Sequence, residues 1–507
     1  MKKDCLIGID VGTSGVKVIT LDPSGQILQS IVEDYPLYQP HSGWTEQEPE
    51  DWWAATIRGL RKLTAACPDH MPIAIGLSGQ MHGMVALDAQ DQVIRRAILW
   101  NDQRTGHQCT EITEMAGGMD SLLLATNNQM LTGYTGGKIL WLKQVEPAAY
   151  ARTRLILNPK DYIRFRLTGA KCTDVSDASG FGLYDVAGNH WANTLIDRIG
   201  LDRSLFPPVV ESTAIAGRVS DAAAVETSLP AGIPVAGGGG DAVISTTGLG
   251  LIKPGRIAVT LGTSGVVAMG LPQFMPNPQG SLQVFRGNAP DTFTAMGVTL
   301  SAAGSYHWFR QALGRHETAL ANERGTSAFR LMDQEAARVP AGSDGLLFLP
   351  YLNGERCPIH DAHARGGFIG LTARHEFGHF ARAVLEGVAF SMRQVYELIL
   401  GKSGEAVQSS EVVLAGGGAA SPLWRQITSD VFSLPVRTVY GSAEGGAFGA
   451  SLVAGVAVGL WPSLEATVDL IRSESEVFPN MENKARYDAA YAKYIRMYDA
   501  LRWSMDG

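Results

Sequence analysis

The chain has 507 residues, a length that exceeds one hydrophobic core and predicts two to three domains. An apolar fraction of 45% and a charged fraction of 18% are typical of a well-packed globular protein and exclude a disordered one. A formal net charge of −8, without any run of Lys or Arg, argues against a nucleic-acid partner.

The first half alternates strand-like and helix-like segments. In chain order we expect a hairpin with a third strand over 5–35, a helix over 48–66, strands at 73–77, 84–88 and 96–100, and helices at 105–118, 138–146 and 155–167. We expect residues 174–180 to form a polar loop. The glycine-rich run 235–241 closes this half.

The second half begins near residue 249. In chain order we expect a second hairpin over 257–266, a strand at 293–300, a helix at 302–313, a strand at 345–350, a helix at 379–400, a strand at 411–414, and helices at 421–432, 444–458 and 483–503. No linker rich in Pro, Ser or charge separates the halves, so we expect domains 1–248 and 249–507 to touch extensively and to hinge.

Cysteine usage and hydropathy indicate the compartment. The five cysteines show no Cys-x-x-Cys spacing, which is typical of reduced thiols, and no apolar signal core precedes the first strand, so we expect a cytoplasmic protein without a membrane partner. The uncharged stretch 445–461 is short for a membrane span and predicts a buried helix. The sequence leaves the oligomeric state open, with a homodimer as one option.

A short motif occurs twice, about 250 residues apart, between strand-like segments. The first copy is Gly12-Thr13-Ser14 and the second is Gly262-Thr263-Ser264. Glycine permits a tight turn that turns amide N–H groups and hydroxyls toward one point, an arrangement that suits a phosphate. One such turn is ordinary turn composition, but two copies in the same context resemble the paired phosphate-binding hairpins of the actin-like ATPase fold.

Motifs spread over nearly the whole chain name a family by their order and spacing. They are Asp10-x-Gly12-Thr13-Ser14, 79–83 (GQMHG), 100–104 (WNDQR), 160–162 (KDY) with 167–169 (LTG), 239–241 (GGD), 262–265 (GTSG), 349–352 (LPYL) with 354–356 (GER), 366–371 (GGFIGL) with 383–387 (AVLEG), and 416–419 (GGGA). Through these motifs the chain resembles the FGGY carbohydrate kinases.

The resemblance implies an α/β fold with two actin-like (ribonuclease H-like) domains, related by duplication, and an active-site cleft between them. It implies that ATP and Mg²⁺ are used to phosphorylate a small open-chain sugar, with the C5 hydroxyl of D-xylulose as the first expectation. Another ketopentose, a polyol or gluconate remains an alternative substrate.

The family also implies roles for particular residues. Asp241 is expected to accept the proton of the sugar hydroxyl, and Asp10 to hold Mg²⁺, because a carboxylate beside a phosphate needs a cation between them. Residues expected at ATP are Gly12, Thr13, Ser14, Lys17, Gly262, Thr263, Ser264, Gly416, Gly417, Gly418 and Ala419. Residues expected at the sugar are Gln80, Met81, His82, Trp100, Asn101, Asp102 and Arg104.

Two other readings stay open. An actin-like nucleotide switch that moves a protein partner would share both hairpins but would need no sugar loop. The sequence His375-Glu376-Phe377-Gly378-His379 is a formal zinc metalloprotease motif, but the apolar helix is expected to begin only near Phe380, so the two histidines would not share a settled helix face. Ala242 stands where many relatives carry Asn, and Gly136 and Gly137 where Pro is common, which puts the sugar preference in doubt.

Overall fold

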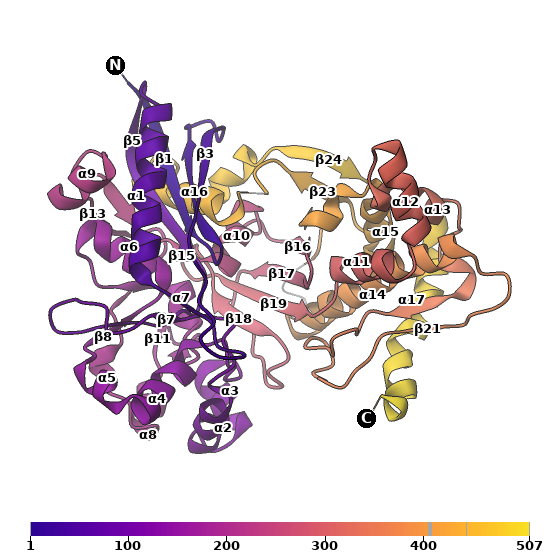
Figure 1. Cartoon of the computed structure of the whole chain (residues 1–507), viewed down its shortest axis with the longest axis horizontal. Coiled ribbons are helices and arrows are strands. Elements are labelled where there is room, and N and C mark those ends of the chain that lie inside the picture. The colour runs from indigo at the N-terminus through magenta and orange to yellow at the C-terminus, as the bar shows by residue number, and fades with distance from the viewer. Residues whose placement is uncertain (1, 404–407, 443, 506–507) are drawn as a thin grey trace.

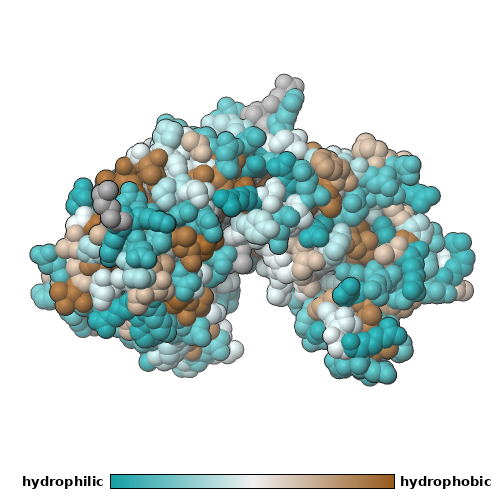
Figure 2. Space-filling model, turned by 90° about the horizontal axis from the view of Figure 1, so that it is seen from above, coloured by the Kyte–Doolittle hydropathy of each residue, from teal (hydrophilic) through white to brown (hydrophobic). Residues whose placement is uncertain are grey.

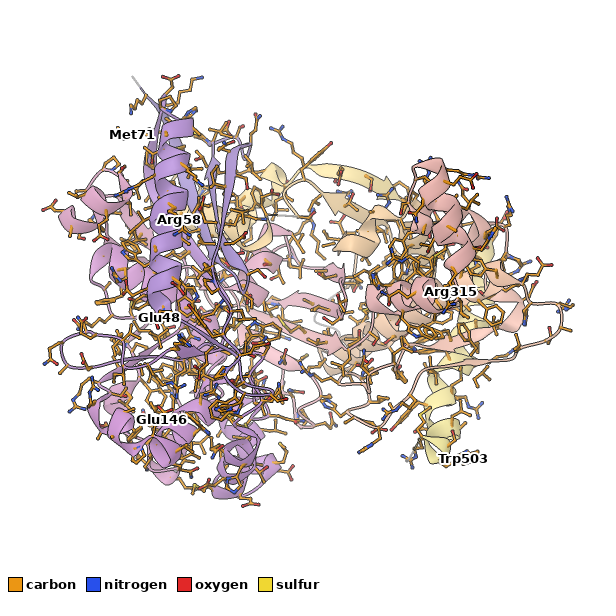
Figure 3. The ribbon with its side chains drawn as sticks, in the orientation of Figure 1. Glu48, Arg58, Met71, Glu146, Arg315 and Trp503 are labelled. Atoms are coloured by element: carbon orange, nitrogen blue, oxygen red, sulfur yellow. The ribbon has the colours of Figure 1, made fainter. Side chains whose placement is uncertain are left out.

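The computed structural model describes residues 2–403, 408–442 and 444–505. The chain forms two lobes, each built on a mixed β-sheet with helices against it (Figure 1). Seen from above, the surface is deeply indented between the lobes (Figure 2). Side chains cover both lobes. Met71, which is half-exposed, lies at the top of the first lobe, and the exposed Trp503 lies at the bottom of the second (Figure 3).

The sheet of the first lobe has the order β13–β14–β5–β1–β2–β3 in the described residues, with β15 also pairing with β5. Its strands are β1 (Lys3–Val11), β2 (Gly15–Leu21), β3 (Ile27–Asp34), β5 (His70–Gly79), β13 (Ile215–Arg218), β14 (Pro234–Ala236) and β15 (Gly239–Gly240). The helices of this half are α1 (Pro49–Ala66), α2 (Gly106–Met115), α3 (Met119–Thr126), α4 (Thr135–Val145), α5 (Pro147–Arg152), α6 (Pro159–Thr168), α7 (Val175–Ser179), α8 (Asn193–Arg198), α9 (Asp221–Thr227) and α10 (Asp241–Gly248).

The sheet of the second lobe has the order β18–β19–β17–β16–β22–β23–β24. Its strands are β16 (Arg256–Leu261), β17 (Gly265–Leu271), β18 (Gln283–Arg286), β19 (Phe293–Thr299), β22 (Glu411–Ala415), β23 (Val436–Val439) and β24 (Ser473–Val477). The helices of this half are α11 (Ala303–Ala312), α12 (Arg315–Arg324), α13 (Ala328–Ala337), α14 (Phe377–Ser403), α15 (Pro422–Phe432), α16 (Gly445–Ala457) and α17 (Met481–Leu501).

Short elements complete the description. The two-stranded pairs join β4 (Glu46–Gln47) with β7 (Ala97–Ile98), β6 (Val85–Leu87) with β8 (Leu155–Leu157), β9 (Thr173–Asp174) with β12 (Val209–Val210), β10 (Tyr184–Asp185) with β11 (His190–Trp191), and β20 (Leu347–Leu349) with β21 (Gly367–Ile369). The 3₁₀ turns are η1 (Arg203–Leu205), η2 (Ser343–Gly345), η4 (Gly417–Ala420), η5 (Glu465–Leu470) and η6 (Arg502–Ser504).

The two sheets repeat one pattern of pairing. In the first, β1 pairs antiparallel with β2 and parallel with β5. In the second, β16 pairs antiparallel with β17 and parallel with β22. The predicted turns 12–14 and 262–264 therefore occupy the same place in the two sheets, as the repeated sequence predicts for a duplicated fold.

Helix α16 connects the lobes because its residues come late in the chain but pack on the first sheet (Figure 1). Gly8 and Gly76 face it so closely that a Cβ on them would lie 1.9 Å from the carbonyl oxygen of Ala447 and 1.8 Å from that of Ala450. Only glycine permits such an approach. The buried helix predicted within 445–461 is confirmed over Gly445–Ala457, and the division at residue 248 stays a prediction.

Two of the segments expected from the sequence fold differently in the structure. The segment 155–167 is not one helix, because Leu155–Leu157 pairs as a strand with β6 before Pro159 opens α6. Proline is favoured in the first turn of a helix, so it marks this boundary. The segment 174–180 is not an open loop, since the Asp174 carboxylate accepts from the backbone N–H groups of Ser176 and Asp177 and caps the buried helix α7.

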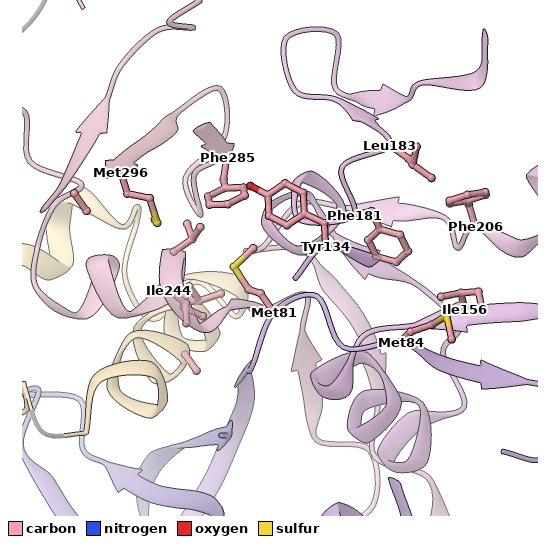
Figure 4. Packing of buried hydrophobic residues seen from close by; sticks show 14 of the residues in the cluster. Met81, Met84, Tyr134, Ile156, Phe181, Leu183, Phe206, Ile244, Phe285 and Met296 are labelled. Carbon is pink, nitrogen blue, oxygen red and sulfur yellow. The ribbon is translucent and has the colours of Figure 1, made fainter. Parts of the chain in front are cut away.

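The cores of the lobes meet below the sugar loop of residues 79–83. There Met81, Tyr134, Phe285 and Met296 pack in one apolar cluster, with Phe285 and Met296 coming from strands of the second sheet (Figure 4). Asn128 adds polar contacts between the halves, because its side chain bonds both the N–H and the carbonyl of Val284. The lobes are therefore joined at the base of the sugar loop.

Candidate active site

Strand register places the two predicted carboxylates at one edge of the first sheet. Asp10 on β1 lies opposite Ser78 on β5, and Ser78 lies opposite Gly239 on β15. Asp241 follows β15 directly as the first residue of α10. Because neighbouring strands are about 4.8 Å apart, the backbones at Asp10 and Gly239 are roughly 10 Å apart. Asp241 comes two residues after Gly239, so both carboxylates belong to the same edge of the sheet.

Asp241 is a partly exposed carboxylate whose pKa is raised to about 7. The main cause of the raised pKa is desolvation of the carboxylate by burial, and the second cause is the negative charge of Asp10. Its Oδ1 accepts from the backbone N–H of Ala242 at 2.7 Å and of Met81 at 3.3 Å. The second bond ties the carboxylate to the loop of residues 79–83, and Oδ2 accepts no hydrogen bond from the described residues.

Asp10 has a raised pKa because it is buried, although the Ser78 hydroxyl and the charge of Lys17 oppose the rise. Ser78 donates to Oδ1 at 2.7 Å, and no other hydrogen bond from the described residues reaches this carboxylate. Helix α16 begins beside it, since a Cβ on Gly446 would lie 2.8 Å from Oδ1. The remaining lone pairs of Asp10 are thus available to a cation or its waters.

The first hairpin turn is held by polar side chains from four segments. The Thr13 hydroxyl donates to Gln80 Oε1 at 3.3 Å and accepts from the Trp100 indole N–H at 3.0 Å. The carbonyl of Thr13 accepts from Gln47, and that of Gly12 from the Tyr35 hydroxyl. The structure therefore engages the Thr13 hydroxyl with protein, while the exposed Ser14 keeps the turn open to a phosphate.

The sugar loop has a distinctive backbone. His82 adopts a φ of 68°, a left-handed conformation that is unusual for a residue other than glycine and is frequent at functional sites. Its carbonyl accepts from Thr135 Oγ1 at 3.1 Å and from the buried Lys138 ammonium at 2.7 Å, which hold it in place. The sequence singled out the loop but not these two supports.

The protonation of His82 follows from its contacts. Nδ1 lies 2.7 Å from the Gly180 carbonyl, which can only accept, so Nδ1 carries the proton and Nε2 is an acceptor. Burial, with the charge of Lys138 as a second cause, lowers the pKa of His82 to about 3. The ring is thus neutral and offers an acceptor to a sugar hydroxyl.

Gln80, Asp102 and Arg104 lie at the predicted site but have their polar groups bonded within the protein. Gln80 is 1% exposed and also donates to Gln47 at 2.8 Å. Arg104 donates to Asp102 through Nε at 2.9 Å and through a terminal nitrogen at 2.8 Å, and its guanidinium lies over Trp44. Their contact with the sugar stays a prediction, whereas their geometry shows them supporting the wall of the site.

Trp100 and Asn101 complete the predicted sugar residues. Trp100 is 47% exposed, so its indole face is accessible beside the first hairpin. Asn101 is half-buried, and its side-chain oxygen has no hydrogen-bond partner among the described residues. Both are better placed than Asp102 to meet a ligand.

A large cavity occupies the second lobe beside the second hairpin. It has a volume of about 1630 Å³, and of the predicted residues Gly262, Thr263, Gly417 and Gly418 line it. Residues that the sequence analysis missed line it too, namely Tyr306, Asp333, Ser421 and Trp424. Asp333 gave no sequence signal because it lies on α13, a helix that was not predicted.

The glycine turn before α15 packs closely against the second hairpin. A Cβ on Gly416 or on Gly418 would lie 2.7 Å from Leu261, whereas a Cβ on Gly417 would meet nothing within 4 Å. Gly416 and Gly418 thus let the turn rest against the second hairpin, and Gly417 leaves open space toward the cavity. Ala419 is buried behind the turn.

The formal zinc motif lies away from these groups. Helix α14 begins at Phe377, inside the motif, and the Nδ1 atoms of His375 and His379 accept from the backbone N–H groups of Thr372 and Glu376. Among the residues that the structure describes, no group of three His, Cys, Asp or Glu side chains is arranged to hold a metal ion. No helix in the same part of the chain has the length and apolar character to cross a bilayer.

Comparisons with known proteins agree with this architecture. Residues 5–248 match the N-terminal domain, and residues 257–458 the C-terminal domain, of the FGGY family of carbohydrate kinases. The xylulose kinase of Bacillus subtilis is 36% identical over 496 residues, covering 97% of this chain and 96% of that protein. A gluconokinase of the same organism is 29% identical over 493 residues, covering 97% of this chain and 95% of that protein.

A solved structure, that of a xyloylose kinase from Brucella ovis, superposes with a TM-score of 0.89 at 33% identity, covering 98% of this chain and 99% of that one. The two family domains span most of the chain and contain both hairpins, the sugar loop and the two carboxylates. The chain belongs to the FGGY family of carbohydrate kinases.

Proposed function

We propose that this kinase transfers the terminal phosphoryl group of ATP to the C5 hydroxyl of D-xylulose, with Asp241 as the general base. The observation that carries the proposal is the strand register that puts Asp241 and Asp10 at one sheet edge beside the sugar loop. Phosphoryl transfer needs alignment, a proton acceptor and charge stabilisation, which are what this edge offers.

Asp241 is suited to remove the proton of the acceptor hydroxyl. A pKa of about 7 keeps enough of the carboxylate ionised at neutral pH while making it a stronger base than an ordinary aspartate. Its Oδ1 is fixed by two backbone N–H groups, which leaves Oδ2 to accept the proton as the oxygen attacks phosphorus. A base of this kind contributes about 10² to 10⁴ in rate.

The donor set at Asp10 fits Mg²⁺. This ion prefers hard oxygen ligands and commonly binds through one or two carboxylates, waters and substrate phosphates, which agrees with a single carboxylate that accepts only the Ser78 hydroxyl among the described residues. When bound, Mg²⁺ would neutralise charge on the phosphates. Asp10 would hold it directly or through water, and Ser78 would keep the carboxylate oriented.

ATP is assigned to the cavity of the second lobe. Its volume of about 1630 Å³ exceeds what an adenosine group needs, and it reaches Thr263 of the second hairpin. The N–H groups of both hairpin turns, the hydroxyls of Ser14 and Ser264, and Lys17 would bind phosphate oxygens. The Thr13 hydroxyl, engaged by Gln80 and Trp100, would act by shaping the turn.

The substrate preference is argued from the relatives and from His82. The Bacillus subtilis xylulose kinase is more similar to this chain than the gluconokinase of that organism, at 36% against 29% identity. The neutral His82 ring offers an acceptor to a hydroxyl, and the nearby Lys138 ammonium is bonded to the carbonyls of His82 and Gly133. A coupled ADP-release assay on D-xylulose, other ketopentoses, polyols and gluconate tests this. Turnover of gluconate or glycerol without turnover of D-xylulose would overturn the assignment.

Replacement of Asp241 by Asn tests the mechanism. We expect sugar phosphorylation to fall by about 10² to 10⁴ because the base is lost, with ATP binding retained. Asp120→Asn, which changes an exposed carboxylate on α3, is the matched control and should keep full activity. Full activity in Asp241→Asn would contradict the proposal and leave the nucleotide-switch reading open.

A further inference from the structure

A buried charged cluster lies behind the Gly237–Gly240 segment that precedes Asp241, and the mechanism above does not use it. Its five members are fully buried: Lys160, Asp161, Arg164, Asp174 and Asp177. The Lys160 ammonium lies 2.8 Å from Asp174 Oδ1 and 2.8 Å from Asp177 Oδ2. Arg164 lies 2.6 Å from Asp161 Oδ1.

Such a cluster is poorly explained as a source of stability. Removing five charged groups from water costs free energy that their mutual attraction repays only with excellent geometry, and apolar replacements are often neutral or stabilising. Here the hydrogen bonding of the cluster is incomplete. Three of its buried polar atoms have no hydrogen-bond partner among the described residues: Asp161 Oδ2, Arg164 Nε and Asp177 Oδ1. A role in fixing one particular backbone geometry is the alternative.

The cluster bonds both ends of the glycine segment. Arg164 donates to the carbonyl of Gly237 at 2.6 Å. The backbone N–H of Gly240 donates to Ser176 Oγ at 3.0 Å, and that hydroxyl donates to Asp174 at 2.6 Å. Four residues that would otherwise be the most flexible in the site are therefore held at their first and last members.

The packing around the segment shows that it fits closely. A Cβ on Gly240 would lie 2.9 Å from Asp177 Oδ1, and one on Gly239 would lie 2.4 Å from the Asn288 amide. Asn288 belongs to the second half of the chain, donates to Ser212 and accepts from Thr247 on α10. Asn288 therefore also holds helix α10, which begins with Asp241, through its bond to Thr247 near the end of the helix.

We propose that Ser176, held by Asp174 and Lys160, is a positioning residue for Asp241: it fixes the N–H of Gly240 and so sets where the first turn of α10 presents the carboxylate. The inference rests on the proposed role of Asp241 as the base. Lys160 acts one step further away: its ammonium lies 2.8 Å from Asp174 Oδ1 and orients this carboxylate so that it accepts the Ser176 hydroxyl.

The test is Ser176→Ala, which removes one buried hydroxyl. We expect kcat to fall about 10- to 100-fold, because a misplacement of about 1 Å at a reacting group has that effect, while KM for ATP and the melting temperature stay close to those of the parent. Ser391→Ala, at an equally buried serine on α14, is the matched control and should keep the parent kcat.

A second comparison separates positioning from a general structural effect. If Ser176 acts through Asp241, adding Ser176→Ala to Asp241→Asn leaves the residual rate unchanged, because the group it positions is already gone. The same fold loss in both backgrounds overturns the inference, and so does a parent-like kcat in Ser176→Ala. An active Asp241→Asn variant would instead remove the proposed function itself.

Discussion

The close contact between α16 and the first sheet gives a prediction whose size follows from the structure. Gly76 lies on β5 directly under α16, and Gly76→Ala would place a Cβ 1.8 Å from the carbonyl oxygen of Ala450. Ordinary contact begins at 3.4 Å, so helix and strand must separate by about 1.6 Å to accept the methyl group. Neither backbone can yield locally, because each is bonded within its own element.

That displacement reaches the site through α16. Gly446 of this helix lies beside Asp10, and Gly449 contacts the Ile244 carbonyl of α10, the helix that carries Asp241. We expect Gly76→Ala to lower the free energy of unfolding by about 1–3 kcal/mol or more, as overpacking does. We also expect kcat to fall about 10²-fold, since the two carboxylates move relative to each other.

The measurements are thermal unfolding and steady-state kinetics on the same preparation. Gly106→Ala is the matched control, because a Cβ at Gly106 would meet nothing within 4 Å and the residue lies in helix α2. It should be neutral or slightly stabilising. A Gly76→Ala enzyme with parent melting temperature and kcat would refute the account of α16 as the rigid support of both carboxylates.

Two further predictions concern the titration and the wall of the site. The proposed base, Asp241, is active only when ionised, and its pKa is raised to about 7, so kcat/KM for the sugar should fall about tenfold per pH unit below 7 and level off above it. A flat profile between pH 5.5 and 8 would contradict this. Arg104→Lys should lower the free energy of unfolding by about 3–5 kcal/mol, because lysine cannot reproduce the fork that bonds the fully buried Asp102 or its position over Trp44. An unchanged melting temperature with a raised KM for the sugar would instead make Arg104 a substrate contact.

The sequence predicted secondary structure correctly where that structure depends on residues close together in the chain. The two hairpins, the strand predicted at 73–77 (70–79 in the structure) and the buried helix over 445–457 follow from hydrophobic patterns and glycine placement, which are local properties. It failed at 155–167, where a strand pairs with β6, and at 174–180, where one carboxylate caps a short buried helix. In both places a partner distant in sequence or an unrecognised cap decided the outcome.

The candidate site was likewise predicted only in part from the sequence. The motifs identified Asp10, Asp241 and the sugar loop, but not which polar groups remain for a ligand. Only the fold reveals that Thr13, Gln80 and Arg104 bond to protein, because hydrogen bonds between residues more than 30 positions apart leave no periodic trace. Asp333 was missed because the helix that carries it, α13, was not predicted, and the cavity around it is formed by segments far apart in the chain.

The sequence by itself determined the family, the duplicated strand–turn–strand plan and the identity of the two carboxylates, because each is written in contiguous residues of fixed type and spacing. The tertiary structure decided how those parts are held: α16 returning from the end of the chain onto the first sheet, and Lys160, Asp174 and Ser176 meeting behind Gly240. Which distant side chains meet depends on the free energy of the whole fold. No single stretch of the chain determines that free energy.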